Sequence, residues 1–441
     1  MKLKIRLLLV LSLAIQLGYA QGNIIELPLK QQIGYGSFRM ALKGISPFPE
    51  NKDNPWVNTY PKITKFPQGL TDIKQGSIDT NIYQAVYQDY LLGNITKEWY
   101  AELQQSWGWT PDTLNLSKEP LKTKIAFVSG KDKDGNLKLV IDANNNLDLS
   151  DDDLLSPLDM TPANEEKKYS LTQLPAVDVS IETLVHGKIT PVTVPLRVMY
   201  NSEMNIFLGN FAQYATTEYK GRQIAVLSSA FTDLSYHKLE LAFVDRELKA
   251  GERIGEESLY RKNEYIEIQD AIYQIVGVNT NKNTLILRKA SQPKDELEST
   301  QIGYKAKSFE GKEFKSQEVI SSESLKGKYV LLDFWAIWCG PCLKEMPHLK
   351  ELYGKVDKSK FEIIGIVGDS PANQLAPLMD KYAITWPQIL SDTANEIKEK
   401  FGVNSYPTTF LLDKQGVIVA KNLRGKELEE MVLKLIGEDA L

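Results

Sequence analysis

The feature that most constrains this chain is a pair of cysteines directly after a short apolar run. Residues 330–334 are Val-Leu-Leu-Asp-Phe, typical of a buried strand, and Cys339-Gly-Pro-Cys342 follows at the start of a predicted helix. The unpaired amides at a helix N-terminus favour negative charge at the first sulfur. We therefore expect an available thiolate at Cys339, with Cys342 placed to close a disulfide. The pattern indicates a redox-active pair.

The N-terminal residues indicate export. A basic start is followed by an apolar run at residues 7–15, and small residues precede a plausible cleavage site after Ala20. This pattern predicts a signal peptide over residues 1–20, and no cysteine follows it that could carry a lipid anchor. The chain has only two cysteines, which fits an oxidising space where stray thiols would pair with a reactive disulfide. We expect a periplasmic or secreted protein.

Length and charge set the domain count and exclude one class of partner. A chain of 441 residues is long enough for two or three domains. Its net charge of −5 provides no basic surface of the kind that nucleic acid requires. A polar, aperiodic stretch with a proline near residues 289–301 marks a boundary. We assign residues 21–290 to an N-terminal region of one or two domains, 291–300 to a linker and 301–441 to a C-terminal domain.

The N-terminal region is predicted to be mainly β with a small helical insertion. Alternating apolar and polar residues predict a three-stranded meander over residues 264–288 and further strands at 196–200, 205–208, 222–227 and 238–244. Two helices are predicted from apolar and aromatic residues at helical spacing: Tyr83, Val86, Tyr87, Tyr90 and Leu91, then Trp99, Leu103 and Trp107. We interpret this aromatic stripe as the core of a helix pair rather than a ligand site.

The C-terminal domain has the alternating pattern of an α/β fold. Strands are predicted at residues 330–334, 361–367, 408–412 and 417–420. Helices are predicted between and after them, at residues 342–353, 372–382, 395–401 and 426–435. Such alternation predicts helices layered on a partly parallel sheet.

The residues around the cysteine pair resemble a known family. The segment around the pair is similar to the active-site motif of the TlpA/ResA branch of exported thioredoxin-like proteins. It consists of Trp338-Cys339-Gly340-Pro341-Cys342, with Asp-Phe-Trp-Ala before it and Glu-Met-Pro after it. The resemblance covers roughly residues 300–441, about a third of the chain. It implies a thioredoxin-like fold for the C-terminal domain, and the N-terminal region resembles no family that we recognise.

The resemblance also implies roles for single residues. Asp333 matches a buried carboxylate that accepts a proton from Cys342, and Glu345 matches a glutamate near the disulfide. Tyr406-Pro407 matches a cis-proline loop that presents backbone to the substrate. The implied catalytic residues are Cys339, Cys342, Asp333, Glu345 and Pro407. The implied substrate-binding residues are Trp338, Gly340, Pro341 and Tyr406.

The function implied is thiol–disulfide oxidoreduction on protein substrates, with the cysteine pair as its redox group and no required cofactor. The Gly-Pro spacer resembles the reducing members of the fold and favours a reductase that a membrane electron donor supplies. A disulfide oxidase or isomerase is the alternative, as is a partner-binding β protein with an accessory redox domain. A thiol peroxidase is disfavoured, because Leu332 and Ala336 stand where that motif has proline and threonine or serine.

A second motif lies in the N-terminal region. Asp142, Asn144, Asn146, Asp148 and Asp153 have the ligand spacing of an EF-hand-type calcium loop. Leu147 stands where that motif has glycine, and a strand precedes the loop in place of a helix. The spacing fits either a structural calcium site or a solvated acidic turn.

Overall fold

The structure is a computed structural model that describes residues 23–38, 42–51, 53–112, 115–159, 176–230, 232–245 and 252–438. The chain divides into two compact units, one ending at Lys289 and the other beginning at Ala290. The predicted signal peptide lies outside the described residues. In the ranges that are described, no helix is both long and apolar enough to cross a membrane.

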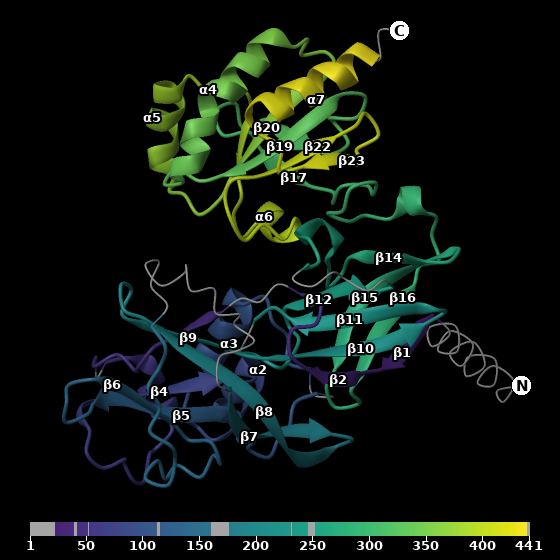
Figure 1. The fold of residues 1–441 in the computed structure, drawn as a ribbon. Helices are drawn as coiled ribbons and strands as arrows, with labels where there is room; N and C mark the ends of the chain where they lie inside the picture. Colours follow the sequence, from purple (N-terminus) through teal and green to yellow (C-terminus); the bar gives the residue numbers. More distant parts are fainter. Residues whose placement is uncertain are drawn as a thin grey trace, which may run out of the picture. The chain divides into compact units, whose positions relative to one another are not determined.

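The unit that begins at Ala290 is built on a five-stranded mixed sheet in the order β21-β20-β19-β22-β23 (Figure 1). β19, β20 and β21 run parallel, and β22 and β23 are antiparallel to their neighbours. The strands are β19 (Tyr329–Trp335), β20 (Phe361–Val367), β21 (Gln388–Leu390), β22 (Thr408–Leu412) and β23 (Ile418–Lys421). A short hairpin of β17 (Glu310–Lys312) and β18 (Val319–Ser321) precedes them.

Helices cover both faces of this sheet. They are α4 (Gly340–Lys355), α5 (Ala372–Tyr382), α6 (Ile397–Lys400) and α7 (Gly425–Glu438). Residues of α4, α5 and α7 share one apolar core with Leu331 and Trp335 of β19, whereas α6 packs in a second core with Leu332. Because side chains alternate between the faces of a strand, Asp333 lies on the face that α4 covers. The strand therefore places this acid on the same side as the helix that carries the cysteines.

The unit that ends at Lys289 is mainly β. Its sheets have the orders β1-β16-β15-β14, β13-β12-β11-β10-β2, β3-β9-β8-β7 and β4-β5-β6, and every pair in them is antiparallel. The strands are β1 (Ile24–Pro28), β2 (Lys30–Ile33), β3 (Lys43–Ile45), β4 (Thr71–Asp79), β5 (Lys124–Lys131), β6 (Leu137–Ile141), β7 (Ala176–Val185), β8 (Lys188–Asn201), β9 (Ile206–Phe211), β10 (Gln213–Tyr219), β11 (Arg222–Ser228), β12 (Leu239–Phe243), β13 (Tyr260–Arg261), β14 (Tyr265–Ile268), β15 (Ala271–Asn279) and β16 (Thr284–Lys289). β14, β15 and β16 form the predicted meander.

The helical insertion consists of α2 (Ile82–Leu91) and α3 (Lys97–Ser106). Each begins at a capping residue: the side chains of Asn81 and Thr96 accept hydrogen bonds from backbone N–H groups in the first turn. Of the predicted stripe, Val86, Tyr87 and Leu103 are buried in a shared core between the helices, and Tyr83, Tyr90 and Trp99 pack against it. Leu91 and Trp107 are exposed, so the predicted helix-pair core is confirmed for the other residues of the stripe and not for these two. The fold class of a mainly β region followed by an α/β domain is confirmed.

Candidate active site

The cysteine pair lies at the N-terminus of α4. Cys339 is the capping residue, and a disulfide joins it to Cys342 in the first turn. The backbone N–H of Cys342 donates to Cys339 Sγ over 3.2 Å. Both cysteines are buried, whereas Trp338, Gly340 and Pro341 around them are exposed. In the reduced protein, an amide at the helix N-terminus that points at Sγ favours the thiolate of Cys339.

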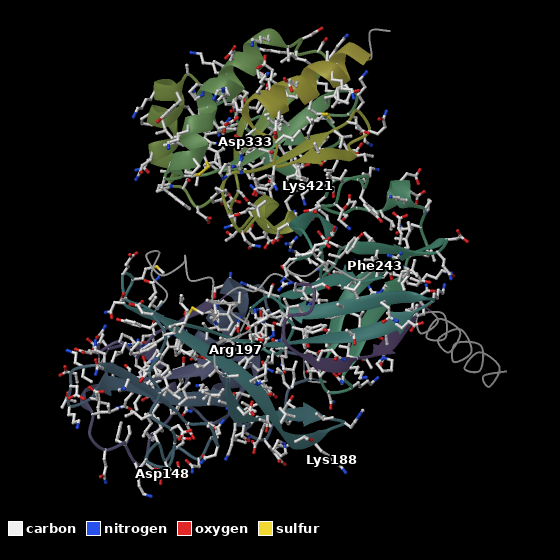
Figure 2. The ribbon with its side chains drawn as sticks, viewed as in Figure 1. Asp148, Lys188, Arg197, Phe243, Asp333 and Lys421 are labelled. Atoms are coloured by element: carbon white, nitrogen blue, oxygen red, sulfur yellow. A yellow bond between two sulfur atoms is a disulfide. The ribbon has the colours of Figure 1, made fainter. Side chains whose placement is uncertain are left out.

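Asp333 is the buried acid of the site (Figure 2). Burial raises its pKa to about 7, the nearby charge of Glu345 acts in the same direction, and Arg424 opposes both. A carboxyl group that titrates near neutrality can both accept and return a proton at physiological pH. Its position on the α4 face of β19 and this pKa suit it to exchange a proton with a cysteine of the pair.

The loop before β22 has the predicted cis-proline. The Tyr406–Pro407 bond is cis, and Arg424 Nη2 donates to the carbonyl oxygen of Pro407 over 2.6 Å. Next to Arg424, the backbone N–H of Gly425 donates to the Glu345 carboxylate. Glu345 therefore links α4 to the start of α7, and it acts on Asp333 through its charge. No motif in the sequence predicted a role for Arg424 in the site.

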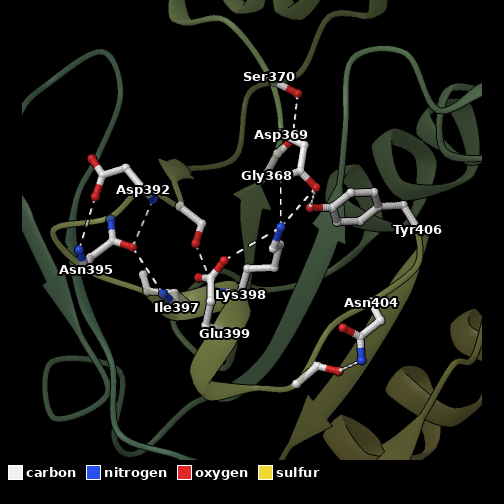
Figure 3. Close-up of polar contacts among 12 residues, drawn as sticks. Gly368, Asp369, Ser370, Asp392, Asn395, Ile397, Lys398, Glu399, Asn404 and Tyr406 are labelled. Atoms are coloured by element: carbon white, nitrogen blue, oxygen red, sulfur yellow. Dashed lines mark hydrogen bonds and ion pairs between the residues drawn. The ribbon is translucent and has the colours of Figure 1, made fainter. Parts of the chain in front are cut away.

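A polar network centres on Asp369, and Figure 3 shows its contacts with Tyr406 and Lys398. Asp369 accepts hydrogen bonds from Tyr406 Oη at 2.9 Å and from Lys398 Nζ at 2.8 and 3.0 Å. The carbonyl oxygen of Asp369 accepts from Trp338 Nε1 at 2.9 Å. The rings of Trp338 and Tyr406 meet edge to face, with centroids 5.8 Å apart. Asp369 thus holds the residue before Cys339 and the residue before Pro407.

The close approach of Tyr406 depends on a glycine. A Cβ atom at Gly368 would lie 2.0 Å from Tyr406 Oη, so a larger residue there would displace the ring. Sequence reasoning missed Asp369 and Lys398. The one available signal was that Asp369 lies two residues after the end of β20, because the carboxyl ends of neighbouring parallel strands share one sheet edge.

Comparison with known proteins matches the C-terminal part of the chain. The profile of the AhpC/TSA family matches residues 302–421. The thiol-disulfide oxidoreductase ResA of Bacillus thuringiensis (strain Al Hakam) is 35% identical over 135 residues, which are 31% of this chain and 76% of that protein. ResA of Halalkalibacterium halodurans is 33% identical over 125 residues, or 28% of this chain and 70% of that protein. This chain belongs to the ResA family of thiol–disulfide oxidoreductases.

Solved structures similar to this unit include two from Bacteroides. The thioredoxin domain of a thiol-disulfide oxidoreductase from Bacteroides vulgatus has 31% identity and a TM-score of 0.29, covering 31% of this chain and 98% of that one. A thiol:disulfide interchange protein from Bacteroides sp. has 30% identity and a TM-score of 0.29, covering 31% of this chain and 90% of that one. The AhpC/TSA profile includes none of the first 301 residues, so the ResA-family assignment concerns the C-terminal unit.

We predict that Asp369 acts as a positioning residue in this ResA-type site. Asp369→Ala removes the acceptor of Tyr406 and the partner of Lys398, so Tyr406 and the Trp338 ring against it lose their fixed orientation. KM for a protein disulfide should rise roughly ten-fold, as expected for the loss of one hydrogen bond to a charged group, with kcat little changed. Steady-state reduction of insulin would measure this, with Asp380→Ala of exposed α5 as the control. An equal loss with a small aromatic disulfide would contradict a role in positioning protein substrates.

The predicted calcium loop folds around Asp142 (Figure 2 labels Asp148 in it). The Asp142 carboxylate accepts from the backbone N–H groups of Asn146 and Leu147, each at 2.9 Å. The side-chain amides of Asn144 and Asn146 donate hydrogen bonds to the Asp151 carboxylate. The Asp152 carboxylate accepts a hydrogen bond from the backbone N–H of Ala143, whereas Asp153 is exposed. Lys65 Nζ pairs with Asp148. Across the described ranges, no three His, Cys, Asp or Glu side chains converge as a metal-binding group.

Calcium binding at this loop stays a prediction. Oxygen ligands at this spacing on an extracellular module bind calcium with a Kd on the order of 10⁻⁴–10⁻³ M. We expect calcium at about ten times that Kd to raise the unfolding temperature of the full chain measurably, because it binds only the folded loop. Asp142→Ala should remove the increase. Identical melting curves in calcium and in chelator would identify the loop as a solvated acidic turn.

Proposed function

We propose that this chain is an exported reductase of protein disulfides. The observation that carries the proposal is the pairing of Cys339 at the N-terminus of α4 with Asp333, whose pKa is about 7, on the same face of the sheet. The first group can exist as a thiolate nucleophile, and the second can take up a proton at neutral pH. Both cysteines lie in the C-terminal unit, so the N-terminal unit is assigned to selecting or positioning a partner.

Reduction proceeds in two exchanges. The Cys339 thiolate attacks one sulfur of the substrate disulfide, which forms a mixed disulfide and releases the other substrate sulfur as a thiolate. Asp333 then accepts the proton of Cys342, and the resulting thiolate attacks Cys339 Sγ. The second substrate thiolate leaves, and the enzyme holds the Cys339–Cys342 disulfide. One substrate thiolate takes the proton from Asp333 and the other takes a proton from solvent, so the substrate has gained two electrons and two protons.

The surface around the pair fits a polypeptide substrate. Trp338 is 65% exposed and its indole is held by Asp369, so it offers a preorganised apolar contact beside the disulfide. The Tyr406 ring meets the Trp338 ring edge to face, and Arg424 donates to the Pro407 carbonyl. We assign substrate binding to Trp338, Gly340, Pro341 and Tyr406 on this basis.

Turnover requires a source of electrons. A reducing protein in an oxidising space returns to its disulfide form after each cycle, so we propose a membrane reductant that carries cytoplasmic electrons outward. Export itself rests on the predicted signal peptide. No metal or organic cofactor is needed for the exchange, because thiols and disulfides carry all the electrons.

The redox potential tests the direction of electron flow. We predict a value near that of thioredoxin, about −270 mV, for the Cys339–Cys342 couple of the full chain. Equilibration against glutathione buffers, followed by thiol alkylation and mass spectrometry, measures it directly because the chain has no other cysteine. A potential above about −180 mV, the range of protein disulfide isomerase, would assign the protein to disulfide oxidation or isomerisation instead.

A further inference from the structure

The N-terminal unit contains an aromatic cavity unrelated to the cysteine pair. It has a volume of about 270 Å³ and lies beside the ends of β4 and β5, α2 and the short helix Pro55–Thr59. Its aromatic lining residues are Phe48, Trp56, Tyr60 and Trp107. The Phe48 and Tyr60 rings stack with centroids 3.7 Å apart, and Trp107 is 38% exposed, so the aromatic wall reaches the surface. The volume is at the small end of ligand sites, which span roughly 300–1,000 Å³.

The polar part of the lining contains a carboxyl group with an unused acceptor. Asp79 ends β4, and its Oδ1 atom is enclosed without a hydrogen-bond partner among the described residues. Its cross-strand neighbour Lys124 instead donates to Asp89 at 2.8 Å and to the Thr59 carbonyl at 2.7 Å. An enclosed acceptor without a donor is unfavourable. A positive charge held in the adjoining cavity would compensate the ionised Asp79 carboxylate.

The charges around the cavity favour a cation. Among the charged groups that act on Asp79, Lys124 and Lys43 lower its pKa, whereas Asp89 and Asp233 raise it. Burial is the main cause of the raised pKa of Asp79, which is the expected response of an acid without enough compensating charge. A positive charge in the cavity would therefore stabilise the ionised form of Asp79, and a negative charge would oppose it.

We propose that this cavity binds an organic ammonium group, with the aromatic rings around the cation and Asp79 as its counter-ion. Aromatic faces attract ammonium groups, more strongly when water is excluded, and several rings together form the usual site for quaternary ammonium ligands. A hard metal ion would want a set of oxygen ligands in place of indole and phenyl faces. A sugar could stack on the rings but would leave the negative charge unbalanced.

Choline and its uncharged isostere 3,3-dimethylbutanol test the charge requirement directly. Titration of the full chain by calorimetry and by tryptophan fluorescence should show saturable choline binding, with a Kd on the order of 1 mM or tighter. The isostere fills the same volume without the charge, so it should bind at least about ten-fold more weakly. Comparable binding of the two, no saturable choline binding, or tighter binding of methyl glucoside would each overturn the proposal.

Two variants locate the site. Asp79→Asn keeps the shape of the side chain but removes its charge, so it should weaken choline binding about ten-fold or more. Trp107→Leu removes a partly exposed aromatic ring of the cavity wall and should also weaken choline binding. Glu50→Gln removes an exposed carboxylate of the neighbouring segment and should leave affinity unchanged. Circular dichroism, together with disulfide exchange at the cysteine pair of the other unit, reports whether each variant is folded. Wild-type choline affinity in both folded variants would place the ligand elsewhere and refute the assignment.

Discussion

Cys339→Ser is expected to abolish disulfide exchange, whereas Cys342→Ser should trap the protein as a mixed disulfide with its partner. Cys339 is the capping residue of α4 and the cysteine to which an amide points, so we assign its sulfur as the nucleophile. Cys342 is 1% exposed and serves to release the covalent intermediate. Insulin reduction measures the first effect, and non-reducing electrophoresis with mass spectrometry of the adduct measures the second.

The cysteine content makes this test unusually clean. Because the chain has no third cysteine, an adduct of Cys342→Ser can form only through Cys339. The double variant, with both cysteines replaced by serine, is the control for non-covalent capture. Recovery of no adduct from Cys342→Ser expressed in an exporting host, or an equal yield from Cys339→Ser, would contradict the assigned order of attack.

Asp333→Asn is expected to slow exchange most strongly near neutral pH. An asparagine cannot accept the proton of Cys342, and proton transfer by a positioned group contributes about 10²–10⁴-fold to rate. We expect a loss of at least about 100-fold at pH 7 that shrinks toward high pH, where the thiol ionises unaided. Stopped-flow measurement of the resolving step across pH tests this. A loss of the same size at every pH would leave Asp333 as a structural acid.

The same substitution should stabilise the oxidised protein. The pKa of Asp333 rises from its ordinary 3.8 to about 7 on folding, so the folded state binds the proton more tightly than the unfolded state. Stability is therefore greatest below the unfolded pKa, falls as pH rises between the two values, and is lower by up to about 4 kcal/mol above pH 7. Asp333→Asn removes this dependence. Denaturant unfolding should find the variant more stable than wild type at about pH 8 and similar at about pH 4.

Glu345→Gln is a control with a smaller expected effect on the pH dependence of both exchange and stability. The charge of Glu345 raises the pKa of Asp333, so its removal should lower the midpoint of the pH dependence without abolishing proton transfer. The hydrogen bond to the Gly425 backbone can persist through the amide oxygen. An unchanged midpoint would show that burial alone sets the pKa of Asp333.

The patterns that predicted the C-terminal unit are local in the chain. Residues 330–334 and 361–367 are apolar runs of strand length, and both are strands with nearly those bounds. Helical spacing predicted residues 372–382, which form α5. The hairpin of β17 and β18 was missed because its three-residue strands are too short for a period to show. In the N-terminal unit, strands were found where alternation was clean, but the order of the sheets could not be predicted.

The sequence by itself determined the fold class of both regions, the cysteine pair at the start of a helix, and the chemistry of that pair. Those properties depend on residues within a few positions of one another, so the strand and helix periods and the three-residue spacing of the cysteines can be recognised in the sequence. Only the tertiary structure decided which distant residues complete the site. Asp369 reaches Trp338 across 31 residues because the parallel strands β19 and β20 end at one sheet edge. Glu345 meets Gly425 across 80 residues because α4 and α7 pack in one apolar core. The pKa of Asp333 and the unpaired oxygen of Asp79 likewise follow from burial, which packing alone sets.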